Sequence, residues 1–361
     1  MGTGAGRGAN SVFAMAETSA DGAAEREVQT REGAAAILRQ ILSGAWSPEQ
    51  IRRFLLDHNA VPATPDELAG FLDAVRDAAT PVVLPVDVAA RAIDIVGTGG
   101  DKSGSVNVST MTALVVAGAG VPVCKHGNRS ASSACGTADV LEALGARIEQ
   151  SPAQVAHNVA TTGFGFVFAP AFHPAFRHVG PVRRELGVPT VFNLLGPMAN
   201  PAHVAYMMVG VANDTHLATM ASVLAKRTVG SLVVHGHGGL DELSLAGPNR
   251  AIATGVVAPV AAASPADFTI DAVELGLGHA HNDALRGGDA THNAQVVTDV
   301  LINRLRGPVR DVVVLNAGVA LFVARSATSP RAGIELAEAS IESGRAKAVL
   351  DEFVAASNLS A

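Results

Sequence analysis

The stretch from residue 94 to residue 136 constrains the fold of this chain more than any other. The segment 92–96, apolar except for Asp94, leads into the glycine loop GTGGD (97–101). After an apolar helical run, a second apolar segment leads into the polar loop KHGNRSASS (125–133). This order predicts a βαβ unit of a parallel sheet. Ligands of open α/β sheets bind at the loops that follow the carboxyl ends of strands, so the two loops predict one binding site.

The residues of the two loops indicate an anionic ligand. Glycine allows bare backbone N–H groups to approach an anion, and the N-terminus of the following helix adds favourable partial charge. The second loop offers many donors, among them Lys125, Arg129 and three serines. Taken alone, the first loop also fits an ordinary tight turn, and Lys125 fits a solvated residue at a strand end. Together the loops predict a substrate with more than one phosphate.

Composition excludes several classes of protein. Charged residues make up 16% of the 361 residues and hydrophobic residues 48%, which is enough apolar material for a sizeable core, and the length suggests two domains. A formal net charge of -7 argues against nucleic acid as a partner. Apolar runs such as 111–123 are shorter than the roughly 20 residues that span a bilayer. With two cysteines, Cys124 and Cys135, interpreted as structural, we expect a cytoplasmic protein without membrane contact.

The N-terminal part of the chain predicts helices and no strand. Residues 1–26 are rich in Gly, Ala, Ser and Glu and are interpreted as a disordered leader. Apolar residues then recur at helical spacing in three segments up to residue 75, and Ser-Pro at 47–48 and Thr-Pro at 64–65 are typical helix starts. We therefore expect a small all-helical domain over residues 27–85, with 81–85 as a linker.

Strands and helices alternate from residue 86 to residue 361. This alternation predicts an α/β fold with a mostly parallel sheet flanked by helices. We expect a helix capped by Asn107 or Ser109, a helix over 133–144, β-rich structure over 256–275 and a last buried segment over 312–317. The predicted strands are 92–96, the apolar segment before the second loop, 164–168, 205–211 and 231–234.

Further motifs follow the two loops in a fixed order. They are FHP (172–174), VRRELG (182–187), FNLLGPMANP (192–201) and HGHGGLDEL (235–243). With GTGGD, the NVST that follows it (107–110) and the KHGNR loop, this series resembles the anthranilate phosphoribosyltransferase family from about residue 34 to near the C-terminus. The resemblance implies the nucleoside phosphorylase/phosphoribosyltransferase-like fold, with its helical domain completed by a segment near 172–188.

The resemblance also implies an activity. Such an enzyme transfers the phosphoribosyl group of phosphoribosyl pyrophosphate to the amine of anthranilate and releases pyrophosphate, the second step of tryptophan biosynthesis from chorismate. It implies Mg²⁺, two ions per subunit, and a homodimer formed through the helical domain. No catalytic acid or base is assigned, because aligning the substrates and stabilising the leaving group suffice for this reaction.

Site residues are assigned by matching positions to the family's motifs. For phosphoribosyl pyrophosphate they are Gly97, Gly99, Gly100, Asp101, Ser105, Asn107, Ser109, Thr110, Lys125, Ser132 and Ser133. For anthranilate they are Gly97, Asn128, His173 and Arg183, and for the metal they are Ser109, Asp241 and Glu242. Adjacent carboxylates at a glycine-rich strand end suit Mg²⁺, although an acidic pair in isolation is more often simply solvated. A guanidinium suits the carboxylate of anthranilate.

Two departures from the family's pattern bear on different properties, the first on the dimer contact and the second on the acceptor substrate. Residues 58–62 replace a basic, glycine-containing turn, and Phe176 stands where many relatives carry Tyr. The second departure is the best support for an alternative function, that of a paralogue that uses another aromatic acceptor. A pyrimidine nucleoside phosphorylase or a non-catalytic relative would share the fold, and the acidic pair argues against the non-catalytic relative. His126 is interpreted as a residue that holds the loop and is not assigned to catalysis, while Arg129 fits either a phosphate clamp or an ion pair with an acid. Of Arg183 and Arg184, one is expected on the surface, and Arg183 is the position that matches the family.

Overall fold

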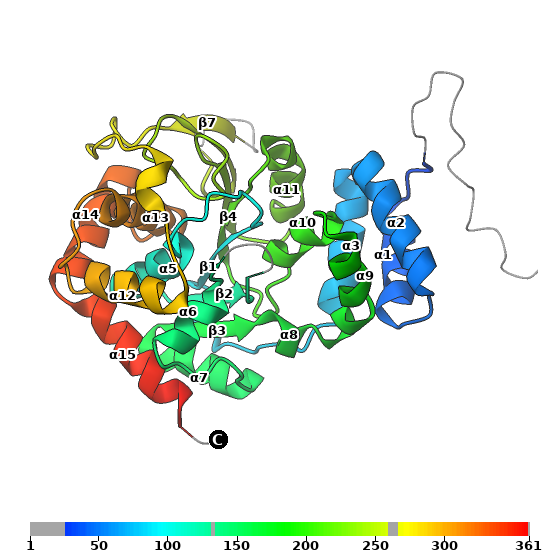
Figure 1. The fold of residues 1–361 in the computed structure, drawn as a ribbon, viewed down its shortest axis with the longest axis horizontal. Helices are drawn as coiled ribbons and strands as arrows, with labels where there is room; N and C mark the ends of the chain where they lie inside the picture. The colour runs from blue at the N-terminus through cyan, green and yellow to red at the C-terminus, as the bar shows by residue number, and fades with distance from the viewer. Residues whose placement is uncertain (1–25, 131–133, 259–265, 360–361) are drawn as a thin grey trace, which may run out of the picture.

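The structure, a computed structural model, describes residues 26–130, 134–258 and 266–359. In this part of the chain, one sheet carries helices on both faces, and a group of mainly N-terminal helices stands beside it (Figure 1). The predicted fold class, a mostly parallel sheet flanked by helices with a smaller helical part at the N-terminus, is confirmed.

The sheet has seven strands in the order β3-β2-β1-β4-β5-β6-β7. Strands β1 to β5 are parallel, and β6 and β7 add an antiparallel edge. The parallel strands are apolar almost throughout because helices cover both of their faces. The strands are β1 (Ile93–Gly97), β2 (Val123–Gly127), β3 (Phe164–Phe168), β4 (Tyr206–Gly210), β5 (Gly230–His235), β6 (Asn249–Gly255) and β7 (Ala266–Ile270).

One face of the sheet is covered by helices from the middle and the end of the chain. Helix α5 (Val108–Gly118) packs against α13 (Pro308–Val323) and α15 (Arg345–Ser357), and α13 packs against α14 (Pro330–Glu342). The last buried segment expected from the sequence is the middle of α13, and two more helices follow it. Because α13 is apolar on nearly all sides, it has no polar face from which its period could be recognised.

The other face of the sheet shares an apolar core with the N-terminal helices. The first three helices begin where predicted, with Ser47 and Thr64 forming capping boxes. Helices from residues 180–198 pack against them. Since one core runs from these helices onto the sheet, the division into domains at residue 85 stays a prediction. The helices concerned are α1 (Arg31–Leu42), α2 (Pro48–Ala60), α3 (Pro65–Asp77), α7 (Pro152–Thr162), α9 (Gly180–Leu186), α10 (Val191–Met198) and α11 (Leu217–Leu224).

Several predicted boundaries need correction. The helix expected over 133–144 begins at Thr137, because Gly136 occupies its N-cap position. Of residues 256–275, the structure describes 256–258 and 266–275, and these described residues contain one strand, β7, while β6 ends before the range begins. Residues 1–25 of the predicted leader lie outside the described residues, but Arg26 is held by the buried carboxylate of Glu67.

Six short elements and one longer helix complete the part of the chain that the structure describes. None of the helices in the described ranges has both the length and the apolar character needed to cross a membrane. The remaining elements are α4 (Val86–Ala89), α6 (Thr137–Ala143), α8 (Ala169–Phe172), η1 (Pro174–His178), η2 (Asp214–His216), η3 (Asn282–Leu285) and α12 (Ala290–Leu301).

Candidate active site

The glycine loop after β1 and the acidic loop after β5 meet at the carboxyl edge of the parallel strands. The backbone N–H of Gly99 donates to Asp241 Oδ2 at 2.6 Å, and that of Thr98 donates to the carbonyl of Gly210, at the end of β4, at 2.9 Å. A Cβ atom at Gly210 would lie 1.6 Å from the carbonyl oxygen of Asp241. Glycine at the end of β4 therefore allows the acidic loop to lie directly on the sheet edge.

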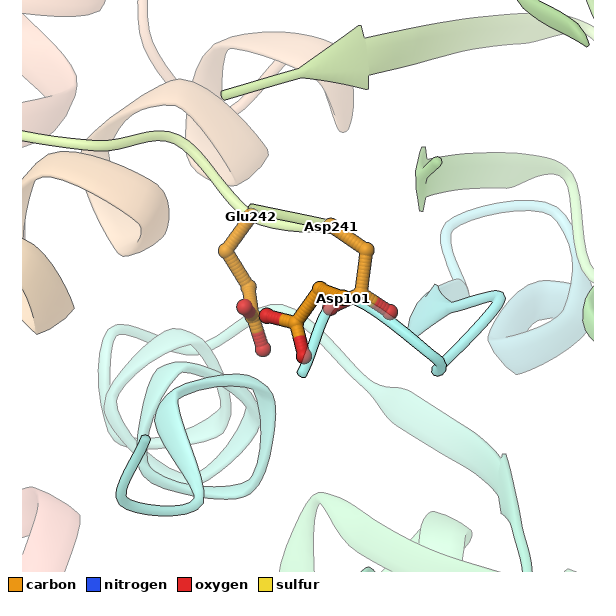
Figure 2. A group of neighbouring side chains, drawn as sticks. All are labelled: Asp101, Asp241 and Glu242. Atoms are coloured by element: carbon orange, nitrogen blue, oxygen red, sulfur yellow. The ribbon is translucent and has the colours of Figure 1, made fainter. Parts of the chain in front are cut away.

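Three carboxylates converge where the two loops meet. One oxygen from each of Asp101, Asp241 and Glu242 lies within 4.8 Å of the others, and Figure 2 shows the side chains turned toward one another. Two oxygens of this cluster, Asp101 Oδ2 and Glu242 Oε2, are buried and have no hydrogen-bond partner among the described residues. Unpaired carboxylate oxygens in this arrangement fit a hard divalent cation such as Mg²⁺.

The pKa values of the acids in this cluster also indicate a site for a cation. Burial, followed by the charge of Asp101, raises the pKa of Asp241 to about 6. Burial, followed by the charges of Asp241 and Asp101, raises the pKa of Glu242 well above its usual value. Ser109, in the first turn of α5, lines the same small cavity as the two adjacent acids. The structure thus brings the three predicted metal ligands together and adds Asp101, which the sequence assigned to the phosphates.

Lys125 and His126 lie in strand β2 and not in the loop that follows it, which corrects the picture of an exposed donor surface. Lys125 is 1% exposed, and its ammonium donates to the carbonyl of Ile95. Burial lowers the pKa of this ammonium, while the charges of Asp94 and of the acidic pair oppose that shift. Lys125 is therefore a buried amine whose charged form is disfavoured by burial and favoured by the nearby acids.

The remaining phosphate candidates differ in how far their polar groups are already engaged. Gly99 and Gly100 are exposed at positive φ, so their backbone is open to a ligand. Asn107 stands at the N-cap of α5 without capping it, because its amide binds the carbonyl of Cys135 and the side chain of Asn293. Ser105 pairs with Arg286 in an isolated β-bridge. The hydroxyl of Thr110 lies 3.5 Å from that of Thr137. Ser132 and Ser133 lie outside the described residues.

A hydrogen-bonded histidine pair lies beside these loops. His126 Nδ1 is 3.1 Å from the carbonyl oxygen of Gly196, which can only accept, so Nδ1 carries the hydrogen. His126 Nε2 must then accept from His173 Nε2–H, 3.2 Å away, which leaves His173 Nδ1 as a buried acceptor without a partner among the described residues. Burial lowers the pKa of His126 to about 3 and that of His173 to about 4, so both rings are neutral.

An aromatic group continues from His173 to Arg183. Phe176 stacks on His173 with ring centres 5.1 Å apart and meets Phe192 edge-on at 5.4 Å. The guanidinium of Arg183 lies 5.4 Å from the centre of the Phe192 ring and donates to Asn193 Oδ1. Arg183 has no ion-pair partner among the described residues, and burial lowers its pKa. An unpaired cation beside flat rings suits a planar carboxylate ligand.

Three other polar residues near the site are exposed to solvent. Asn128 is exposed in the loop after β2, where its side chain accepts from the backbone N–H of Arg129. Arg129 forms ion pairs with Asp139 and Glu142, so it is engaged by acids. Arg184 is exposed, which leaves Arg183 as the arginine that faces inward.

Two buried polar residues were missed by the sequence analysis. The carboxylate of Asp94, fully buried in β1, accepts from the N–H of His126 at 3.1 Å and from the amide of Asn200 at 2.8 Å. The amide of Asn316, in α13, binds the backbone of Leu243 beside the acidic pair. In the sequence, each of these two residues is a single polar residue within an otherwise apolar segment, and this pattern could have indicated a buried, hydrogen-bonded side chain.

Comparison with a family model defines the class of protein to which this chain belongs. The model of the glycosyl transferase family, a/b domain, matches residues 89–347, a range that contains all seven strands of the described sheet and most of the helices around it. The chain is therefore an α/β glycosyltransferase by fold and by sequence.

Individual relatives and solved structures identify the family within this class. The anthranilate phosphoribosyltransferase of Azorhizobium caulinodans is 46% identical over 90% of this chain and 92% of its own length. The crystal structure of the Thermus thermophilus enzyme has a TM-score of 0.86 at 41% identity, covering 92% of this chain and 97% of that one. The Saccharomyces cerevisiae enzyme in complex with PRPP and Mg has a TM-score of 0.82 at 27% identity, over 91% and 93%. The chain belongs to the anthranilate phosphoribosyltransferase family, as its motifs predicted.

Proposed function

We propose that this chain transfers the phosphoribosyl group of phosphoribosyl pyrophosphate to the amine of anthranilate. The products are N-(5-phosphoribosyl)anthranilate and pyrophosphate, and the reaction is the second step of tryptophan biosynthesis from chorismate. One observation carries the proposal: three carboxylates converge on the exposed backbone of a glycine loop, where an anion and a divalent cation can bind side by side. Membership of the family supports it.

Mg²⁺ is the cofactor, with two ions per subunit. Asp241 and Glu242 hold the metal with Ser109, and Asp101 adds a fourth oxygen donor to the same cluster. When bound, the metal offsets the negative charge that develops on the departing pyrophosphate. The raised pKa values of the two adjacent acids support this role, because a bound cation removes the repulsion that raises them.

The donor substrate lies over the glycine loop and the first turn of α5. Gly99 and Gly100 present backbone N–H groups, and Lys125 supplies positive charge from within the sheet. The other residues proposed for this substrate are Gly97, Asp101, Ser105, Asn107, Ser109, Thr110, Ser132 and Ser133.

The acceptor lies between the histidine pair and Arg183. Arg183 pairs with its carboxylate, His173 and Phe176 bound the slot, and Asn128 and Gly97 face the amine. Attack on C1 requires the amine and the leaving pyrophosphate to lie on opposite sides of the sugar, so the site acts by alignment and electrostatics, without a side-chain acid or base.

The assembly and the compartment are also proposed. The helical domain of residues 27–85, completed by the segment near 172–188, forms the contact of a homodimer. The α/β domain of residues 86–361 carries the substrates, and the protein is cytoplasmic.

The test is pyrophosphate release by the full chain with Mg²⁺ and phosphoribosyl pyrophosphate, with and without anthranilate, and mass analysis of the product. Release that depends on anthranilate supports the proposal. Release with a different aromatic acid, and none with anthranilate, would favour the paralogue that Phe176 suggests. Cleavage of thymidine by inorganic phosphate would instead identify a pyrimidine nucleoside phosphorylase.

A further inference from the structure

The two adjacent acids of the site lie in a stretch without helix or strand. Asp241 and Glu242 belong to the connection between β5 and β6, where no sheet ladder fixes the backbone that carries them. Carboxylates that share one cation must be held close together although they repel one another. Some other part of the chain must therefore hold this backbone.

Asn316 of α13 binds the residue that follows Glu242. Its Oδ1 accepts from the backbone N–H of Leu243 at 2.9 Å, and its Nδ2 donates to the carbonyl of the same residue at 2.9 Å. The amide thus takes the place of a neighbouring strand for this one residue. Nδ2 also donates to the carbonyl of Val312 at 2.8 Å, which fixes the side chain on its own helix.

Burial makes this contact rigid. Asn316 is 2% exposed, and hydrogen bonds in such a low-dielectric environment are stronger than in water. Asn316 lines the same small cavity as Ser109, Asp241 and Glu242, so its position is coupled directly to the site.

An amide suits this place better than any charged or apolar side chain. It offers one acceptor and one donor group and adds no charge beside three carboxylates. A carboxylate here would lose the donor and add a fourth negative charge. An apolar side chain would leave the N–H and the carbonyl of Leu243 unpaired in the core.

We propose that Asn316 is a positioning residue that sets the affinity of the Asp241–Glu242 pair for a divalent cation. This inference rests on the proposed function, since it deepens the role of the same metal site. Residues that orient metal ligands typically contribute 10- to 100-fold to metal affinity.

The test is a titration of the full chain with Mn²⁺ alone, with free Mn²⁺ measured by electron paramagnetic resonance. The wild type is compared with Asn316→Leu, with Asn316→Ala, and with the double variant Asp241→Ala, Glu242→Ala. Of the two substitutions of Asn316, Asn316→Ala leaves room for water to replace the amide. The matched control is Asn158→Leu, because Asn158 is also buried and bonded, to Gln150, but lies in α7 against β3, four strands from β5.

We expect the Kd for Mn²⁺ to rise about tenfold or more in a folded Asn316 variant and to stay within about twofold of wild type in Asn158→Leu. An unchanged Kd in either folded Asn316 variant, or an equal loss in the control, would overturn the inference. Wild-type binding that does not depend on Asp241 and Glu242 would instead overturn the proposed metal site. The two failures are therefore distinguishable.

Discussion

Gly97 and Asp241 lie so close together that no side chain fits between them. A Cβ atom at Gly97 would lie 2.2 Å from Asp241 Oδ2, the oxygen that accepts from the N–H of Gly99. The glycine at the end of β1 is thus required by the carboxylate from the loop after β5. This contact joins the glycine loop and the acidic pair into one site.

A methyl group at Gly97 should displace that carboxylate. We expect Gly97→Ala to fold but to lose at least about 100-fold in kcat/KM, since misplacement by about 1 Å costs that much in a site that works by alignment. Steady-state kinetics with a check of folding by circular dichroism measure this. Gly278→Ala is the control, because a Cβ atom there meets nothing within 4 Å. Near-normal activity of Gly97→Ala would show that Asp241 has room to move without consequence.

Removing one charge from the acid cluster should stabilise the metal-free protein. The folded pKa of Asp241 is about 6, above its usual value of 3.8, so ionisation costs stability as pH rises from about 4 to about 6. We expect Asp241→Asn to melt at a higher temperature than wild type at pH 7.5 in a chelator, with the gap closing toward pH 4. Mg²⁺ should raise the melting temperature of wild type far more than that of the variant. A variant less stable than wild type at pH 7.5 contradicts this account.

The sequence predicted the parts of the site whose chemistry depends on residue type and local order. The glycine loop follows β1, Ser109 lies in the first turn of α5, and the acidic pair lies beside them, which agrees with the expected positions, while their roles stay predictions. Consecutive glycines and adjacent acids can be recognised from a few neighbouring residues. The end of β2 was predicted too early, since a strand buried on both faces has no polar alternation to mark its limit. Lys125 was therefore taken for a loop residue.

Contacts between distant segments could not be predicted in this way. His126 and His173 are 47 residues apart, and only the packing of α8 beyond β3 brings their rings together. Asn316 is a single amide in an apolar helix, and its partner Leu243 lies 73 residues earlier. Such contacts between residues far apart in the sequence depend on tertiary structure, and the local pattern of a single sequence does not predict them.

The histidine pair should make the protein acid-sensitive. Both folded pKa values, about 3 and about 4, lie below the usual 6.5, so the unfolded chain binds more protons and stability falls as pH drops below about 6.5. Two such groups contribute a slope of roughly 2 to 3 kcal/mol per pH unit near pH 5. Urea unfolding of the double variant His126→Gln, His173→Gln from pH 5 to pH 8 should show a shallower dependence by about this amount. Exposed His157→Gln is the control, and an unchanged slope in the double variant would refute the assignment.

The two neighbouring arginines should differ in their effect on acceptor binding. Arg183 is half-buried, while Arg184 is exposed. We expect Arg183→Lys to raise the KM for anthranilate about 10- to 100-fold, because an ammonium cannot reproduce a bidentate contact with a carboxylate. Arg184→Lys should leave that KM unchanged, and the KM for phosphoribosyl pyrophosphate should change little in both. Equal effects of the two substitutions would place the carboxylate of the acceptor elsewhere.

The most direct test of the central claim is a fluorescence assay of anthranilate consumption with phosphoribosyl pyrophosphate and Mg²⁺. It compares wild type, wild type with a chelator, and the double variant Asp241→Ala, Glu242→Ala. We predict that anthranilate fluorescence decays with wild type and stays constant in the other two. No decay with folded wild type, or undiminished decay with the double variant, would contradict the account of a phosphoribosyl transfer that depends on the metal at this acid cluster.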